Sequence, residues 1–82
     1  MKARKILEKA RGSAVALRFT EATRLAESLG FGLSRVRGSH HIYTHPGVPE
    51  LLNLQEVRGM AKPHQIRQLL RLMERYNLEL RD

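Results

Sequence analysis

Residues 31–46 read FGLSRVRGSHHIYTHP, and this stretch decides the fold that the sequence predicts. Residues 31–37 and 40–44 are short runs with apolar, β-branched and aromatic residues, which favour strands. Between them, Gly38 and Ser39 are typical of a tight turn. We therefore predict a β-hairpin here, with the turn at its tip and three histidines in or beside its second strand.

Amphipathic helices are predicted on both sides of this hairpin, because apolar residues recur there at spacings of three and four. The predicted helices span residues 2–11, 21–29 and 63–76, and a third strand is expected over residues 51–57. Thr20 is the predicted N-cap of the second helix, and Pro63 suits the first position of the last helix. Three antiparallel strands with helices on one face form a small two-layer α+β domain, here with an extra N-terminal helix.

The composition narrows the classes of function. The chain has 82 residues, enough for one domain, and 15 Lys and Arg against 8 Asp and Glu give a net charge of +7. Such a balance favours a polyanionic partner, most often nucleic acid. The absence of cysteine excludes disulfides and cysteine-ligated zinc. No apolar run is long enough to span a bilayer, so we expect a cytoplasmic protein without a membrane partner.

The histidine cluster is the candidate for chemistry, because histidine takes and gives protons near neutral pH. Side chains alternate between the faces of a strand, so His40 and Ile42 share one face while His41 and Tyr43 share the other. This alternation separates two of the histidines and disfavours a metal site, and the turn at residue 46 makes His45 a structural or peripheral residue. Either a general acid or base for RNA cleavage, or one packed and one exposed histidine, fits the pattern.

Basic and aromatic residues near the histidines are candidate RNA contacts. Arg35, Arg37 and Lys62 flank the cluster in sequence or across the hairpin and suit phosphate binding, although an ordinary solvated strand edge is the alternative. Tyr43 can stack on a base or pack in the core. A basic ridge on the last helix, which meets RNA, a protein partner or only water, consists of Arg67, Arg71 and Arg75.

These motifs together resemble the HicA, or YcfA-like, family of small bacterial and archaeal toxins. The matching pieces lie within residues 20–78 and are Leu29-Gly30-Phe31, Arg37-Gly38-Ser39-His40-His41-Ile42-Tyr43, His45-Pro46 and Lys62-Pro63-His64-Gln65-Ile66-Arg67-Gln68-Leu69-Leu70. The segment over residues 1–18 is an extra N-terminal helical extension, which leaves residues 19–82 as the HicA-like domain. The loop at 47–50 and the third strand differ from those of the commoner short toxins.

The resemblance implies a fold like that of a double-stranded-RNA-binding domain and a metal-independent mRNA endonuclease that uses a single histidine. By position in the Gly-Ser-His element, that histidine is His40, with His41 as the alternative, and Ser39 joins the expected RNA contacts. It also implies mRNA as the substrate, a HicB-type antitoxin as the partner and no cofactor. The rival hypothesis is a non-catalytic module that binds RNA or a protein partner on the same fold.

Overall fold

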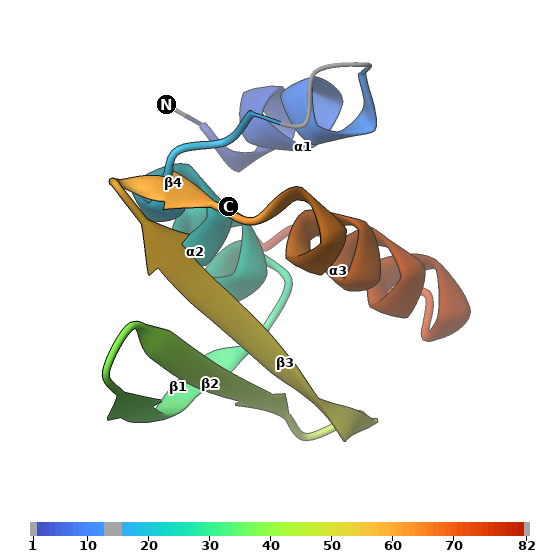
Figure 1. The fold of residues 1–82 in the computed structure, drawn as a ribbon. Coiled ribbons are helices and arrows are strands. Elements are labelled where there is room, and N and C mark those ends of the chain that lie inside the picture. Colours follow the sequence, from blue (N-terminus) through green and yellow to red (C-terminus); the bar gives the residue numbers. More distant parts are fainter. Residues whose placement is uncertain (1, 13–15, 82) are drawn as a thin grey trace.

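The chain folds as a four-stranded sheet covered by helices, seen in a computed structural model that describes residues 2–12 and 16–81. The helices α2 and α3 pack against the sheet, and α1 packs against α2 (Figure 1). In chain order the elements are α1 (Ala3–Arg11), α2 (Phe19–Ser28), β1 (Gly32–Arg37), β2 (His40–His45), β3 (Val48–Val57), β4 (Met60–Ala61) and α3 (Pro63–Arg75). This confirms a small α+β domain with an antiparallel sheet and three helices.

The sheet has the strand order β1-β2-β3-β4, with every neighbouring pair antiparallel. The predicted number of three strands was therefore wrong. The fourth strand has only two residues, and it exists because Arg58 and Gly59 both adopt positive φ angles, of 52° and 80°. A two-residue loop of that kind returns the chain against β3, so that Val57 pairs with Met60. The likeness to a double-stranded-RNA-binding domain stays a prediction.

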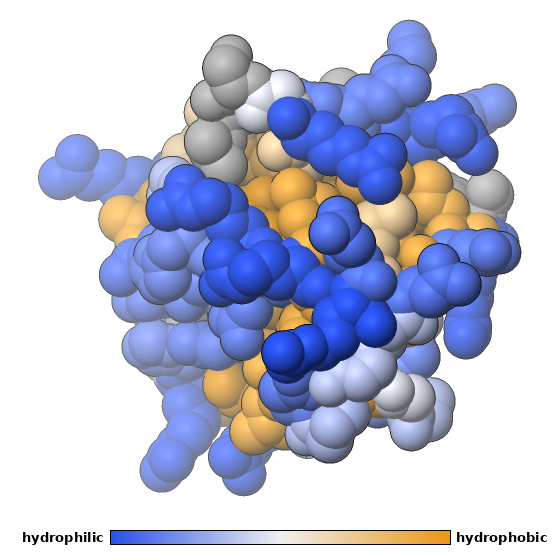
Figure 2. Space-filling model, turned by 90° about the vertical axis from the view of Figure 1, so that its right-hand side faces the viewer, coloured by the Kyte–Doolittle hydropathy of each residue, from blue (hydrophilic) through white to orange (hydrophobic). Residues whose placement is uncertain are grey.

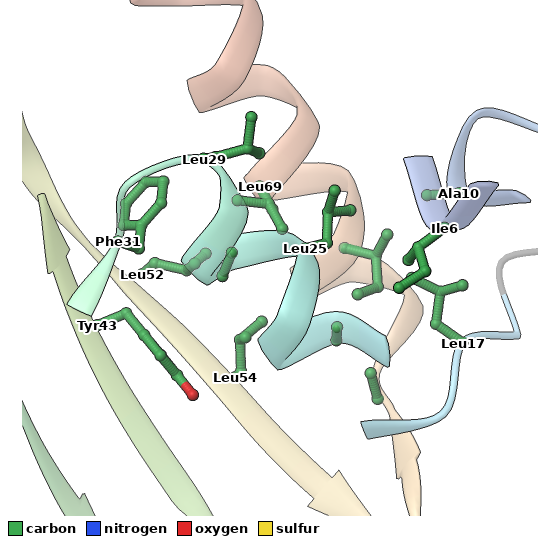
Figure 3. Close-up of a cluster of buried hydrophobic side chains, with 14 of the residues drawn as sticks. Ile6, Ala10, Leu17, Leu25, Leu29, Phe31, Tyr43, Leu52, Leu54 and Leu69 are labelled. Atoms are coloured by element: carbon green, nitrogen blue, oxygen red, sulfur yellow. The ribbon is translucent and has the colours of Figure 1, made fainter. Parts of the chain in front are cut away.

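One hydrophobic core joins the sheet to all three helices. Leu25 of α2, Leu54 of β3 and Leu69 of α3 are fully buried in it, and Ile6 of α1 enters the same cluster (Figure 3). Burying a leucine or isoleucine side chain stabilises the fold by about 1.5–3 kcal/mol. The N-terminal helix is therefore part of the packed structure. Within the described residues no helix is long and apolar enough to cross a membrane.

The start of α2 differs from the predicted one. The helix begins at Phe19, one residue before the expected N-cap at Thr20. The backbone N–H of Phe19 donates to the carbonyl of Gly59, 2.8 Å away, and the backbone N–H of Arg18 donates to the Glu21 carboxylate at 2.9 Å. This second bond is the main reason that the pKa of Glu21 lies below its ordinary value. Tertiary and side-chain partners thus set where the helix starts.

A buried glutamine joins α3 to the free edge of β3. Gln55 pairs with His40 of β2 on one edge of β3. On the other edge the short β4 pairs only with Glu56 and Val57. There the backbone N–H of Gln55 donates to Oε1 of Gln65 at 2.6 Å. The Gln65 side chain is only 5% exposed. A buried donor left without a partner costs about 1–3 kcal/mol, so this contact holds the first turn of α3 against the sheet.

We predict that Gln65→Met lowers the free energy of unfolding by about 1–3 kcal/mol, because the volume is kept and the Gln55 N–H loses its acceptor. Chemical denaturation measures the change. Gln68→Met, one turn later and partly exposed, is the matched control and should change stability by less than about 0.5 kcal/mol. Equal effects of the two substitutions would contradict the assigned role.

A carboxylate at the start of β3 holds the other end of α3. Glu50 accepts a hydrogen bond from the Tyr76 hydroxyl at 2.5 Å and one from Arg75 at 3.0 Å. The bond from Tyr76 is the first reason that the pKa of Glu50 lies below its ordinary value. A group with a lowered folded pKa stabilises the fold above its unfolded pKa, and this contribution is lost as the pH falls through the folded pKa.

We therefore predict that Glu50→Gln destabilises the protein most near neutral pH, and that its difference from the unmodified protein shrinks as the pH falls below about 4.3. Urea denaturation across a pH series measures this. Glu74→Gln, an exposed neighbour on α3, is the control and should give a difference that stays small throughout. A Glu50→Gln effect that is constant with pH would show that the lost contact is not ionic.

Candidate active site at the β1–β2 hairpin

The tip of the hairpin is a two-residue loop. Arg37 pairs with His40 across it, and Gly38 adopts a φ of 59°, which a side chain would disfavour. This turn directs the carbonyl of Ser39 toward β3, where it accepts the backbone N–H of Glu56 at 3.2 Å. The Gly-Ser pair thus ties the start of β2 to the end of β3.

Strand alternation places the two adjacent histidines on opposite faces of the sheet. His40 lies on the face turned away from the helices, with Arg37 directly across from it on β1. His41 lies on the helix face, with Leu54 as its partner on β3. This register agrees with the prediction that the two histidines face opposite sides of the sheet, so their rings contact different residues.

The ring of His41 is held in a defined orientation. It packs on the ring of Phe19, with the centroids 4.6 Å apart, and its Nδ1 lies 3.2 Å from the carbonyl oxygen of Ser39. A carbonyl oxygen only accepts, so Nδ1 carries the proton in the neutral ring and Nε2 carries the lone pair. A half-buried histidine of this tautomer is prepared to take a proton at Nε2.

The ring of His40 is exposed and less constrained. Its Nδ1 lies 3.1 Å from the amide nitrogen and 3.3 Å from the amide oxygen of Asn53 on β3. Since one of these atoms donates and the other accepts, the contact does not select a tautomer. His40 therefore lacks the fixed proton position that the carbonyl of Ser39 gives to His41.

The predicted RNA contacts fall on different parts of the surface. Arg35 and Arg37 are exposed on β1, and their strand partners, Ile42 and His40, place them on the open face. Lys62 precedes α3 and follows β4, which is two strands across the sheet from the hairpin tip. Because His40 pairs with Gln55 and Ala61 pairs with Glu56, Lys62 lies level with the hairpin tip, at the same end of the sheet.

Of the two roles predicted for Tyr43, stacking on a base and packing in the core, the structure supports packing. Its side chain is only 2% exposed and belongs to the core cluster, pointing between the helices and the sheet (Figure 3). Burial, followed by the nearby charge of Glu27, raises the pKa of its hydroxyl. No ring face is left for an RNA base, so the predicted stacking is corrected to a packing role.

His45 is engaged through both of its ring nitrogens. Its Nε2 lies 3.1 Å from the carbonyl oxygen of Leu29, and its Nδ1 accepts the backbone N–H of Gly47 at 2.9 Å. The ring also meets Phe31 edge-on, with the centroids 5.0 Å apart. These contacts join the end of β2 to the end of α2, so His45 serves the fold.

Among the described residues no group of three His, Asp or Glu side chains is arranged to hold a metal ion.

Two residues of this region were missed by the sequence analysis. They are Phe19, which precedes the predicted helix over residues 21–29, and Asn53, which lies in the strand predicted over residues 51–57. The alternation of β3 would have placed Asn53 on the open face, but its register with β2 was not predictable. The packing of Phe19 on His41 depends on the position of α2 above the sheet and has no local signal.

These features define a small, basic α+β domain that presents one oriented histidine beside a glycine-serine turn. A family model described as the HicA toxin of bacterial toxin-antitoxin systems matches residues 19–74. Because this match covers more than half of the chain, the protein belongs to the HicA toxin family. Membership makes it a toxin-type component with an antitoxin partner. Searches of curated proteins and of solved structures gave no match.

We predict that His45→Ala lowers the free energy of unfolding by about 1–3 kcal/mol, because the Leu29 carbonyl and the Gly47 N–H lose their partner. The exposed His40→Ala variant should change stability by less than about 0.5 kcal/mol. Thermal and chemical denaturation of both variants measure the difference. A stable His45→Ala protein would mean that these bonds contribute little.

Proposed function

We propose that this HicA-family protein is an mRNA endonuclease whose general base is His41, and that a HicB-type antitoxin inhibits it. The observation that carries the proposal is the contact between Nδ1 of His41 and the Ser39 carbonyl, which leaves Nε2 as the basic atom. His40, the histidine first favoured from sequence, becomes the alternative. Its contact with Asn53 does not select a tautomer.

The proposed reaction uses the 2′-hydroxyl of the RNA as nucleophile. Nε2 of His41 takes the hydroxyl proton while the 2′-oxygen attacks the adjacent phosphorus, and the 5′-oxygen leaves and takes up a proton from water. The products are a 2′,3′-cyclic phosphate and a 5′-hydroxyl end. The carbonyl of Ser39 holds the proton on Nδ1 and keeps the ring in place while Nε2 takes up the hydroxyl proton.

Positive charge at the same end of the sheet supports phosphate binding. Lys62 stands directly before α3, whose first turn contains no acidic residue. The N-terminal end of a helix carries partial positive charge, so it adds to the charge of Lys62 toward a bound phosphate. Arg35 and Arg37 lie on the other face, and in this proposal they contact RNA away from the reacting phosphate.

The exposed apolar residues of β1 support an antitoxin that covers this region. Val36 pairs with His41 and Leu33 pairs with Tyr43, so both lie on the helix face of the sheet. Each is 50% exposed, at an edge strand that the helices do not cover. Neighbouring apolar side chains of this kind favour a protein partner. A partner docked there would lie directly beside the ring of His41.

The paired histidine variants test the catalytic proposal. We expect purified protein to cleave single-stranded RNA in the presence of EDTA, and His41→Ala to lower the rate by at least about 100-fold, the usual contribution of a general base. His40→Ala is the matched control and should keep most of the activity. Gel analysis of labelled RNA measures the rates, and circular dichroism checks the fold of each variant.

Loss of cleavage in His40→Ala with retention in His41→Ala would move the role to His40. If the unmodified protein cleaves none of a varied set of RNAs but binds them with a salt-sensitive affinity, the non-catalytic alternative is favoured. A cyclic phosphate at the new 3′ end identifies the proposed attack by the 2′-hydroxyl, whereas an open 3′-hydroxyl product would exclude it.

A further inference from the structure

Most of the net charge of the chain lies outside the part that matches the family. Residues 1–18 contain six Lys and Arg and a single acidic residue, a net charge of +5, whereas residues 19–82 contain nine against seven, a net charge of +2. The family match begins at residue 19. The segment that adds α1 to the toxin domain therefore also supplies the larger share of the net positive charge.

The charged helix has a fixed position on the domain. Ala3, Ile6, Leu7 and Ala10 bury one side of α1, and Lys9 bonds to the carboxylate of Glu21 on α2 at 3.1 Å. The first turn of α2 also carries Phe19, which contacts His41. One turn of α2 thus lies between α1 and the proposed catalytic histidine.

The other cations of α1 remain on its surface. Arg4, Lys5 and Arg11 are exposed, and they make no ion pair with any residue that the structure describes. Arg11 lines a groove of about 500 Å³ together with Arg67 of α3, and the exposed Arg71 follows one turn further along. We call these five residues, Arg4, Lys5, Arg11, Arg67 and Arg71, the basic strip.

Figure 2 faces the side of the molecule on which α3 lies, and a nearly continuous run of strongly hydrophilic side chains crosses it. Apolar surface shows between these side chains, in keeping with Leu70 and Met73 in the lining of the groove. Within the described residues these five cations form no ion pair, although Glu8 lies one turn from Arg4 and Arg11 and Glu74 lines the groove. The cations outnumber these carboxylates, and the repulsion between them is relieved when a polyanion binds.

We infer that the basic strip is a second RNA-binding surface, on which α1 and α3 hold the phosphate backbone of the strand that His41 cleaves. The inference rests on the proposed function, which makes RNA the substrate. RNA fits the strip better than an acidic protein segment does, because its phosphates repeat along the strand and can follow charges that continue from α1 to α3 across the groove. Such contacts with phosphates would add affinity without sequence preference.

The test is RNA binding by a charge-neutral variant, Arg4→Gln/Lys5→Gln/Arg11→Gln. The matched control keeps the charges at the same positions, as Arg4→Lys/Lys5→Arg/Arg11→Lys. The probe is a short single-stranded RNA, fluorescently labelled and 2′-O-methylated to block attack by the 2′-hydroxyl, and anisotropy is followed over a salt series. Circular dichroism confirms that each variant is folded, since the changed side chains are exposed.

We expect the neutral variant to raise Kd by about tenfold or more and to reduce the slope of log affinity against log salt by roughly 2, because three phosphate contacts are lost. The charge-retaining control should behave like the unmodified protein. Equal Kd and slope in the neutral variant would overturn the inference. If the same variant also lost binding of the antitoxin, the strip would be a surface for the antitoxin instead.

Failure of this inference is distinguishable from failure of the proposed function. Cleavage that depends on His41 together with RNA binding that does not depend on α1 would remove only the second surface. Binding that depends on α1 without any cleavage would keep the surface and remove the catalytic role. A protein that binds no RNA at all would overturn both.

Discussion

The pairing of β2 on both of its edges is the constraint on which the site depends. Its pairing with β1 and β3 fixes its register. Because side chains alternate along a strand, the face that one β2 side chain occupies then determines the face of every other. Tyr43 is buried between the helices and the sheet, and a register slip of one residue would turn its ring to the open face. His41, two positions earlier, must therefore face the helices as well, where Phe19 and the Ser39 carbonyl orient its ring.

Local patterns predicted those parts of the fold that local interactions determine. The apolar spacing of the helices and the turn residues of the hairpin were sufficient for these elements. The fourth strand was not predicted, because two residues are too few to show a periodicity. It also depends on the positive φ of Arg58, and arginine has no preference for positive φ. The start of α2 was also not predicted, because it depends on a contact between residues far apart in the sequence. The N–H of Phe19 donates to the carbonyl of Gly59.

The candidate site was predicted in part. Alternation showed that His40 and His41 face opposite sides, but Ile42 and Tyr43 are both apolar, so neither side was identified as the core by composition. The family resemblance then favoured His40 by its position after Gly-Ser. The backbone contact that selects a tautomer of His41 arises from the turn geometry and has no counterpart in the order of residue types. Which histidine is essential stays a prediction.

The exposed side of the N-terminal helix has a feature that stability alone does not require. The buried side of this helix needs apolar residues, and Ile6 and Leu7 supply them. Its exposed side needs only polarity, and a mixture of acidic and basic residues would provide this with less repulsion between charges. Instead the exposed side is almost entirely basic, while Lys9 alone meets a carboxylate in the described structure. A helix held firmly by its core, whose cations other than Lys9 form no ion pair within the described residues, is suited to bring a rigid positive surface to a polyanion that lies across the domain.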